Sequence, residues 1–369
     1  MPRKAHTAMY NWHKPCGRKV WNVLVVSVLL FSVLSAQEND KDSTSFSEAI
    51  HSILEKNKPS MGGLVQFWNV YQAKGGVRDH FDSFRFRRVE VKLTGSMNEH
   101  ISYDVMVDFA RSVTIPSYQP QPNVLQDAFL VYSFNPQIGL TFGQFKYSLT
   151  YEGLLPSAKL DFVERSEITR MFGDQRDVGL QLSGTLHAMS YAIGIFNGNS
   201  QNTTDGNREK DFAGRLTVKA NDELSIGFSG YLGRTGFEGT VPYHRATFEA
   251  VYQSSLIKIF GEALWARESD FSPAFQKDMG GLYVAALYNV VRRVQAGARY
   301  EYANDHMANV KGIPVHRYTL GLNYSLDNNG NVKLQLNYIL SQAKLYVFFQ
   351  RFFGYDWNNY LYLNFQVSF

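Results

Sequence analysis

The strongest constraint in this sequence is an alternation of apolar and polar residues that recurs from about residue 63 to the end of the chain. In the last segment, for example, single polar residues separate Leu361, Leu363 and Phe365. A period of two places successive side chains on opposite faces of a β-strand. Helical spacing of apolar residues is nearly absent over the same range. The sequence therefore predicts an all-β protein whose strands each have one apolar and one polar face.

We trace sixteen such segments, each nine to twelve residues long. They are residues 64–73, 84–95, 101–110, 124–134, 138–146, 177–185, 189–197, 212–220, 224–233, 245–253, 257–266, 281–290, 294–303, 315–326, 331–341 and 359–369. About 9–11 residues suffice for a tilted strand to cross a bilayer. After the N-terminal region no apolar run reaches eighteen residues, which excludes a bundle of transmembrane helices.

The connections between these segments alternate strictly in length. Those after even-numbered segments have three to five residues, whereas those after odd-numbered segments have ten to thirty. All short turns then lie at one end of the sheet and all long loops at the other, as in outer-membrane barrels. A soluble β-sandwich should have turns of mixed length, and a β-solenoid should repeat at a fixed period. We therefore expect a closed antiparallel transmembrane β-barrel, in which closure leaves no strand edge exposed to lipid.

The N-terminal region has the pattern of a secretory signal peptide. Five basic residues precede an apolar stretch over 20–34, and the small residues Ser35 and Ala36 follow it. We expect residues 1–36 to be removed, residues 37–62 to form a short periplasmic segment, and residues 63–369 to form the barrel.

The first 36 residues contain no acidic residue, so the remaining chain has 32 basic and 33 acidic residues. The only cysteine of the full sequence, Cys16, is lost with the signal peptide. The charge balance of the remaining chain does not favour a nucleic-acid partner.

Residues 345–357 are unusually rich in aromatic side chains for an outer loop. They could continue the preceding strand, or raise the number of strands to eighteen. Aromatic side chains also form girdles at membrane interfaces, and we favour this interpretation over a ligand-stacking surface.

Several motifs resemble the phosphate-selective porins O and P. The motifs are residues 84–93, 103–108, the Gly-Gln-Phe-Lys run at 143–146, and residues 155–166, 176–184 and 194–198. The resemblance implies a sixteen-stranded, trimeric diffusion channel in the outer membrane. It also implies insertion by machinery that reads a C-terminal aromatic strand, for which Phe365, Val367 and Phe369 are suitable. Tyr147 stands where the family often has proline, and no motif assigns phosphate-binding residues here.

The longest connection, residues 147–176, is the third long loop, which in porins of this architecture folds inward as a constriction. Its basic residues, with those at its two ends, are Lys146, Lys159, Arg165, Arg170 and Arg176. The acidic residues of the same stretch are Glu152, Asp161, Glu164, Glu167, Asp174 and Asp177. Five basic against six acidic residues predict no marked preference for anions at the constriction.

The polar faces of the strands predict a lumen of mixed charge. The basic candidates are Arg215, Lys219, Lys258, Arg299, Arg317 and Lys333. The acidic candidates are Asp104, Asp108, Glu249, Glu262 and Glu301. Most of these charges are expected to pair with one another and to solvate the lumen.

The alternation slips by one residue near three arginines, Arg85, Arg87 and Arg88. Phe84 and Phe86 have one parity, whereas the apolar residues from Val89 onward have the other. Such a slip predicts a β-bulge, which could direct two of the arginines inward. Arginine is the side chain best suited to bidentate contact with phosphate or carboxylate.

We find no hydrolase, metalloprotease or nucleotide-binding motif, and the histidines are dispersed. We therefore expect no enzyme, no cofactor and no metal. The sequence favours a porin for small hydrophilic solutes, with anions such as phosphate as candidates. The expected partners are outer-membrane lipid, two further copies of the chain and the insertion machinery. The alternative is an adhesin or structural barrel that acts through its outer loops.

Overall fold

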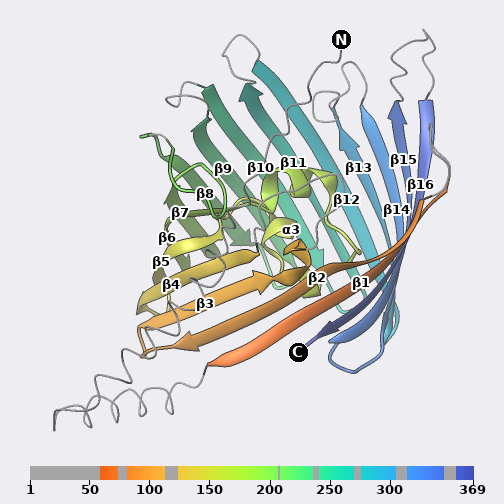
Figure 1. The fold of residues 1–369 in the computed structure, drawn as a ribbon, viewed down its shortest axis with the longest axis horizontal. Helices are drawn as coiled ribbons and strands as arrows, with labels where there is room; N and C mark the ends of the chain where they lie inside the picture. Colours follow the sequence, from red (N-terminus) through yellow and green to blue (C-terminus); the bar gives the residue numbers. More distant parts are fainter. Residues whose placement is uncertain are drawn as a thin grey trace, which may run out of the picture. The chain divides into compact units, whose positions relative to one another are not determined.

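The computed structural model describes residues 59–73, 81–112, 124–206, 208–235, 241–269, 276–304, 314–344 and 355–369. Within them sixteen antiparallel strands form a closed barrel, as predicted (Figure 1). The strands are β1 (Ser60–Ala73), β2 (Phe81–Ser96), β3 (Ile101–Asp108), β4 (Leu125–Asn135), β5 (Ile138–Lys146), β6 (Arg176–Leu186), β7 (Met189–Phe196), β8 (Asp211–Lys219), β9 (Leu224–Thr235), β10 (Val241–Gln253), β11 (Ile257–Ser269), β12 (Gln276–Val291), β13 (Val294–Ala303), β14 (Val315–Ser325), β15 (Val332–Lys344) and β16 (Tyr355–Ser368).

Two regions that the sequence singled out are not covered by this description. Residues 1–58, which hold the predicted signal peptide, lie outside the described residues. So do residues 345–354 of the aromatic segment, while residues 355–357 belong to β16. The described chain forms sixteen strands, not eighteen.

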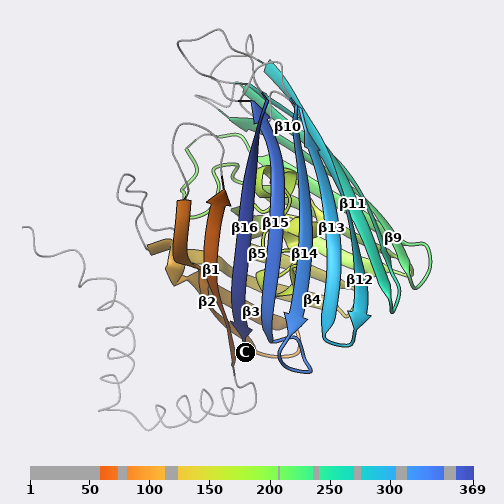
Figure 2. The same ribbon diagram turned by 90° about the vertical axis from the view of Figure 1, so that its right-hand side faces the viewer.

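Each strand pairs with its neighbours in the sequence, and β1 closes the barrel against β16 (Figure 2). This seam runs from the pair Leu64 and Ser368 to the pair Ala73 and Asn359. Phe369 extends the seam, because its backbone N–H and C=O both bond to Gly63. No strand within the described residues is left with an unpaired edge, as a barrel in lipid requires.

Several strands extend beyond their predicted ends on the side of the long loops. The strand predicted to begin at residue 84 begins at Phe81, the one predicted at 281 begins at Gln276, and the one predicted at 359 begins at Tyr355. Ladder hydrogen bonds join backbone groups, so pairing continues where side-chain alternation has stopped. At the opposite end β1 begins at Ser60, within the segment predicted to precede the barrel.

The two faces of the wall differ as the alternation predicts. Leu361, Leu363 and Phe365 point outward and are 39%, 45% and 42% exposed. On the inward face of the same strand Gln366 is buried and accepts a 2.7 Å hydrogen bond from Gln66 of β1. Apolar groups therefore cover the outside, and hydrogen-bonded polar groups line the inside.

The predicted bulge is present where β1 pairs with β2. Gln66 is opposite Arg88, but the next residue, Phe67, is opposite Phe86, so Arg87 has no partner across the ladder. The extra residue restores the phase, since Phe86 remains on the outer face and Arg88 lies on the inner face. Arg85, opposite the buried Trp68, is also on the inner face.

The connection over residues 147–175 lies inside the barrel, where α3 (Tyr151–Leu154), η3 (Ser157–Lys159) and η4 (Thr169–Gly173) fold into short helical turns (Figure 1). We call this connection the constriction loop. None of the helices among the described residues is long and apolar enough to span a membrane.

An apolar cluster fixes one side of the constriction loop against the wall. Phe162, Ile168 and Phe172 pack with inward-facing residues of the strands, including Phe260 of β11 and Tyr283 of β12. Burying each large apolar side chain stabilises the fold by about 2 kcal/mol. The lumen is therefore filled beside β11 and β12.

Candidate channel constriction

Glu262 of β11 is the principal acceptor that holds the start of the constriction loop. Its carboxylate accepts hydrogen bonds from the backbone N–H groups of Tyr151, at 2.5 Å, and Glu152, at 3.2 Å. The hydroxyls of Tyr283 and Thr169 donate to the same carboxylate at 2.7 and 3.3 Å. One carboxyl group that meets four donors from the loop and the wall fixes the loop in one position.

Arg299 of β13 ties the middle of the loop to the wall. Its Nη1 lies 3.2 Å from a carboxylate oxygen of Glu152 and donates to the carbonyl oxygen of Glu164 at 3.0 Å. Glu301, two residues along the strand, lies 2.8 Å from Arg299 and accepts from the backbone N–H of Glu167 at 2.7 Å. These charges are all buried, so each depends on its partners for stability.

Three further cations anchor the loop from other strands. Lys258 lies 2.6 Å from Asp161, Arg317 lies 2.8 Å from Glu167, and Lys333 donates to the carbonyl oxygen of a loop residue at 3.0 Å. The predicted charges of β11, β14 and β15 therefore contact the loop directly.

Arg165 of the loop and Lys146, the last residue of β5, form cross-links at the ends of the loop. Arg165 is 1% exposed and donates to the carbonyl oxygens of Glu152 and Leu155. Asp174 lies 3.2 Å from Arg165 and 2.5 Å from Lys146. Although burial alone would raise the pKa of Asp174, these two cations outweigh it and lower the pKa.

Glu164 is the counter-charge of the bulge. Arg87 approaches it to 2.7 Å and Arg88 to 3.2 Å. Burial opposes ionisation of Glu164, but Arg88 and Arg87 outweigh burial and lower its pKa to about 2. Arg88 also donates to Gln66 at 2.7 Å. The bulge and the constriction loop are therefore joined by a charged contact.

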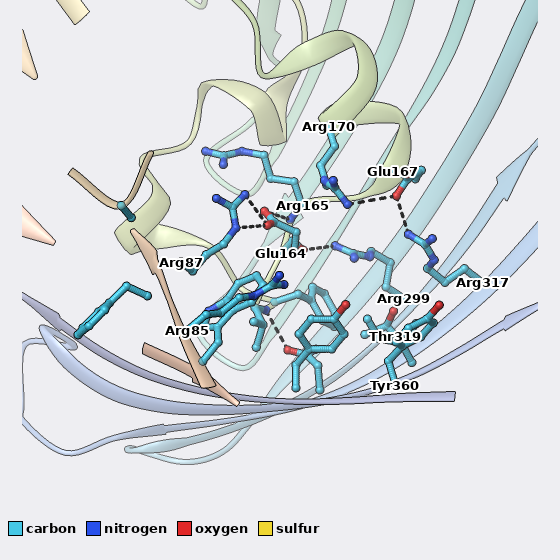
Figure 3. Close-up of a pocket in the computed structure, with 18 of the residues that line it drawn as sticks. Arg85, Arg87, Glu164, Arg165, Glu167, Arg170, Arg299, Arg317, Thr319 and Tyr360 are labelled. Carbon is cyan, nitrogen blue, oxygen red and sulfur yellow. Dashed lines mark hydrogen bonds and ion pairs between the residues drawn. The ribbon is translucent and has the colours of Figure 1, made fainter. Parts of the chain in front are cut away.

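Two cavities lie along the inside of the barrel, one lined by Phe162–Arg165 and Arg170 of the loop, and the other by Leu154–Lys159. We call the first, of about 610 Å³, the loop-side vestibule, because its wall residues lie toward the long loops (Figure 3). The second, of about 580 Å³, is the turn-side vestibule.

Basic side chains outnumber acidic ones in both vestibules. The charged lining of the loop-side vestibule consists of Arg85, Arg87, Arg111, Arg165, Arg170, Arg299 and Arg317 against Glu164 and Glu167. That of the turn-side vestibule consists of Lys92, Lys146, Lys159 and Arg176 against Glu90 and Asp127. The near-neutral charge count of the loop therefore does not describe the lining of these cavities, because Glu152, Asp161 and Asp174 of the loop line neither of them. Two of the basic lining residues, Arg165 and Arg299, are themselves buried and paired.

The other predicted lumen charges mostly form local pairs. Arg215 contacts Glu249 through two hydrogen bonds, and Arg176 contacts Asp127 in the same way. Asp104 lies 2.6 Å from Lys92.

Asp108 and Lys219 have different surroundings. Asp108 is buried, accepts from the backbone N–H of Val89 at 2.9 Å and lies 3.6 Å from Arg111. Lys219 is exposed at the last position of β8, beside a short turn. It lines neither vestibule.

Some lining residues were missed by charge counting. Trp68, Tyr360 and Tyr362 line the loop-side vestibule, and Lys92 lines the other. The parity of the last strand already placed both tyrosines on its polar face. The inward position of Lys92 follows from the bulge, because the bulge puts Lys92 on the same face of β2 as Arg88.

Comparisons with known proteins agree with this architecture. Residues 63–234 match the sequence profile of a family described as phosphate-selective porin O and P. A search of curated proteins found no match.

Solved structures of similar fold include the outer membrane channel DcaP of Acinetobacter baumannii, at a TM-score of 0.65 and 14% identity over 85% of this chain and 97% of that one. An anion-selective porin from Comamonas acidovorans has a TM-score of 0.61 and 12% identity over 85% and 100%. OmpT of Vibrio cholerae in a trimer form has a TM-score of 0.53 and 12% identity over 85% and 99%. At these identities the likeness shows the fold alone.

Proposed function

Because residues 63–234 of this chain belong to the phosphate-selective porin O and P family, we propose that its barrel is a passive channel that prefers small anions to cations. Family and fold are those of an outer-membrane porin, and they point to a channel rather than an enzyme. The preference for anions is the part that we infer from the charges of the lumen.

The observation that carries this proposal is the excess of basic side chains in both vestibules. In the loop-side vestibule Arg85 has no carboxylate within 4 Å among the described residues, and Arg170 has only a loose contact of 3.6 Å with Glu167. Arginines with so little counter-charge raise the local concentration of anions and lower that of cations. Solutes would remain hydrated and move by diffusion, without an energy source.

The cellular setting is part of the same proposal. Residues 1–36 would direct export and be removed, and the barrel would sit in outer-membrane lipid. Phe365 and Phe369 are 42% and 67% exposed, and their place with Val367 at the end of the last strand supports recognition of this strand by insertion machinery. A homotrimer is supported by the family, and OmpT, of similar fold, has a trimer form.

The test is the reversal potential of purified protein in a planar bilayer under a potassium chloride gradient. We expect the sign that corresponds to chloride preference. The substitution Arg85→Gln should reduce it, whereas Arg293→Gln, which removes an exposed arginine in the short turn after β12, should not.

A reversal potential of zero, or one of the opposite sign, would remove the anion preference and leave a general porin. Protein that inserts as a folded barrel but conducts no current would favour the alternative, an adhesin or structural barrel.

A further inference from the structure

The wall of the loop-side vestibule contains both arginines and aromatic rings. Among the arginines, Arg85 and Arg87 come from β2, Arg170 from the constriction loop and Arg317 from β14 (Figure 3). Tyr360 and Tyr362 come from β16. The two tyrosine rings are neighbours, with centroids 6.2 Å apart. Ile339 of β15 adds an aliphatic surface to the same lining. The cavity therefore offers both charge and apolar contact to one ligand.

Trp68 holds two of the arginines in place without neutralising them. The guanidinium carbons of Arg85 and Arg87 lie 5.2 and 5.4 Å from the centre of its ring, and Tyr362 contacts it edge-on at 5.4 Å. A cation–π contact uses the flat face of a guanidinium and leaves its N–H groups free to donate in the plane. Because Arg87 already donates to Glu164, Arg85 is the cation available to a ligand.

Arg170 supplies a second cation to the same cavity. Its side chain is 49% exposed, and its contact with Glu167 is shared with the closer Arg317. Tyr362 lines the same cavity as Arg85, Arg170 and Arg317.

Three unpartnered donors lie in the wall of this cavity. Trp68 Nε1, Thr319 Oγ1 and Asn337 Nδ2 are buried and have no hydrogen-bond partner among the described residues. All three residues line the vestibule and are at least 98% buried. These donor atoms are themselves closed to solvent, so the exposed arginine side chains are the donors that a ligand in the cavity can reach.

We propose that the loop-side vestibule binds flat organic carboxylates, with the carboxylate on Arg85 and Arg170 and the ring against Tyr360 and Tyr362. A small inorganic oxyanion would leave the aromatic and aliphatic wall unused. A neutral ring would leave the arginines without a counter-charge. The proposal deepens the proposed function and rests on it, because an anion must first enter the channel.

Isothermal titration of the purified, folded protein with benzoate, acetate and inorganic phosphate tests this proposal. We expect benzoate to bind about tenfold more tightly than acetate, since ring contacts that add about 1.4 kcal/mol change the affinity by that factor. Arg85→Gln should weaken benzoate about tenfold or more, as loss of a charged hydrogen bond does. Tyr362→Leu and Tyr360→Leu should each weaken benzoate about fivefold and leave acetate unchanged. Arg293→Gln is the matched control for loss of an arginine.

Three outcomes would overturn the inference. They are equal binding of benzoate and acetate, tighter binding of phosphate than of benzoate, and no effect of Arg85→Gln on benzoate. The reversal potential of the same preparations separates the two proposals. Chloride preference without benzoate selectivity refutes only the aromatic carboxylate site, whereas loss of both refutes the anion channel as well.

Discussion

Arg87 shows how one inserted residue changes the charge of the channel wall. Without the bulge, the alternation of β2 would place either Phe86 or Val89 on the wet face. With it, both apolar side chains stay outside, and Arg85, Arg87 and Arg88 all reach the interior. A bulge is therefore a means of concentrating positive charge without exposing polar groups to lipid.

Glu164 limits the effect of that charge, which leads to a prediction at one residue. The substitution Glu164→Gln removes the counter-charge of Arg87 and Arg88 with little change of volume. We expect chloride preference to rise, by up to about fivefold in permeability ratio, because a unit charge about 4 Å away is worth about 1 kcal/mol in water. The measurement is the reversal potential, and Glu99→Gln in the exposed turn after β2 is the control. A fall in chloride preference would show that Glu164 mainly positions the arginines.

The pKa of Glu164 gives a prediction about acid. Its pKa is lowered in the folded protein from 4.5 to about 2, so its ionised form stabilises the fold above about pH 4.5. That contribution is lost as the pH falls from about 4.5 to about 2. We expect the constriction loop to loosen, and the channel conductance to change, within this window. Single-channel recording across this range is the measurement, with Glu164→Gln as the comparison because it lacks the titrating carboxyl. An equal change in Glu164→Gln would assign the titration to another group.

At the scale of elements, the constriction loop is held by charged wall residues from four strands. They are Glu262 and Lys258 of β11, Arg299 of β13, Arg317 of β14 and Lys333 of β15. Their charges were predicted to line the lumen, but their principal task in the structure is to hold the loop.

Removing the main acceptor tests this view of the loop. In Glu262→Ala the backbone N–H groups of Tyr151 and Glu152 lose their acceptor, at a cost of about 1–3 kcal/mol each. We expect faster hydrogen exchange over residues 147–175 with the strands still protected, and larger, noisier channel currents. Glu223→Ala, in the short turn after β8, is the control. Unchanged exchange in the loop would mean that the apolar cluster alone fixes it.

The strands were predictable because a lipid-facing surface and a wet surface impose opposite chemistry on alternate residues. The bulge was predictable for the same reason, since the slip of phase after Phe86 is visible in the sequence. The neutralisation of charges by pairing was not predictable from the sequence. Counting Glu152 and Asp174 as lumen charges suggested a neutral constriction, but whether a carboxylate is buried against Arg299 or faces water depends on contacts far apart in the chain. The apolar cluster was also hidden, because Phe260 looks like one more apolar residue of its strand.

For the whole molecule, the sorting of charge matters more than its sum. A chain with nearly equal numbers of basic and acidic residues still has more basic than acidic side chains lining its two vestibules, and the buried Glu152, Glu262 and Glu301 line neither of them. A diffuse field of this kind acts on ions at a distance and is weakened by salt. A site that touches its ligand is weakened much less.

Salt should therefore separate the two effects in one protein. The screening length falls from about 10 Å at 0.1 M salt to about 3 Å at 1 M. We expect the ratio of chloride to potassium permeability to approach one as the mean potassium chloride concentration rises over this range. Arg85→Gln should lower the ratio at low salt and change it little at high salt. The reason is that the Arg85 guanidinium attracts chloride mainly through its electric field, which high salt screens. A ratio that stays constant would mean that chloride is selected by direct contact, and the partly neutralised arginines, Arg85 and Arg170, would then be the residues to substitute together.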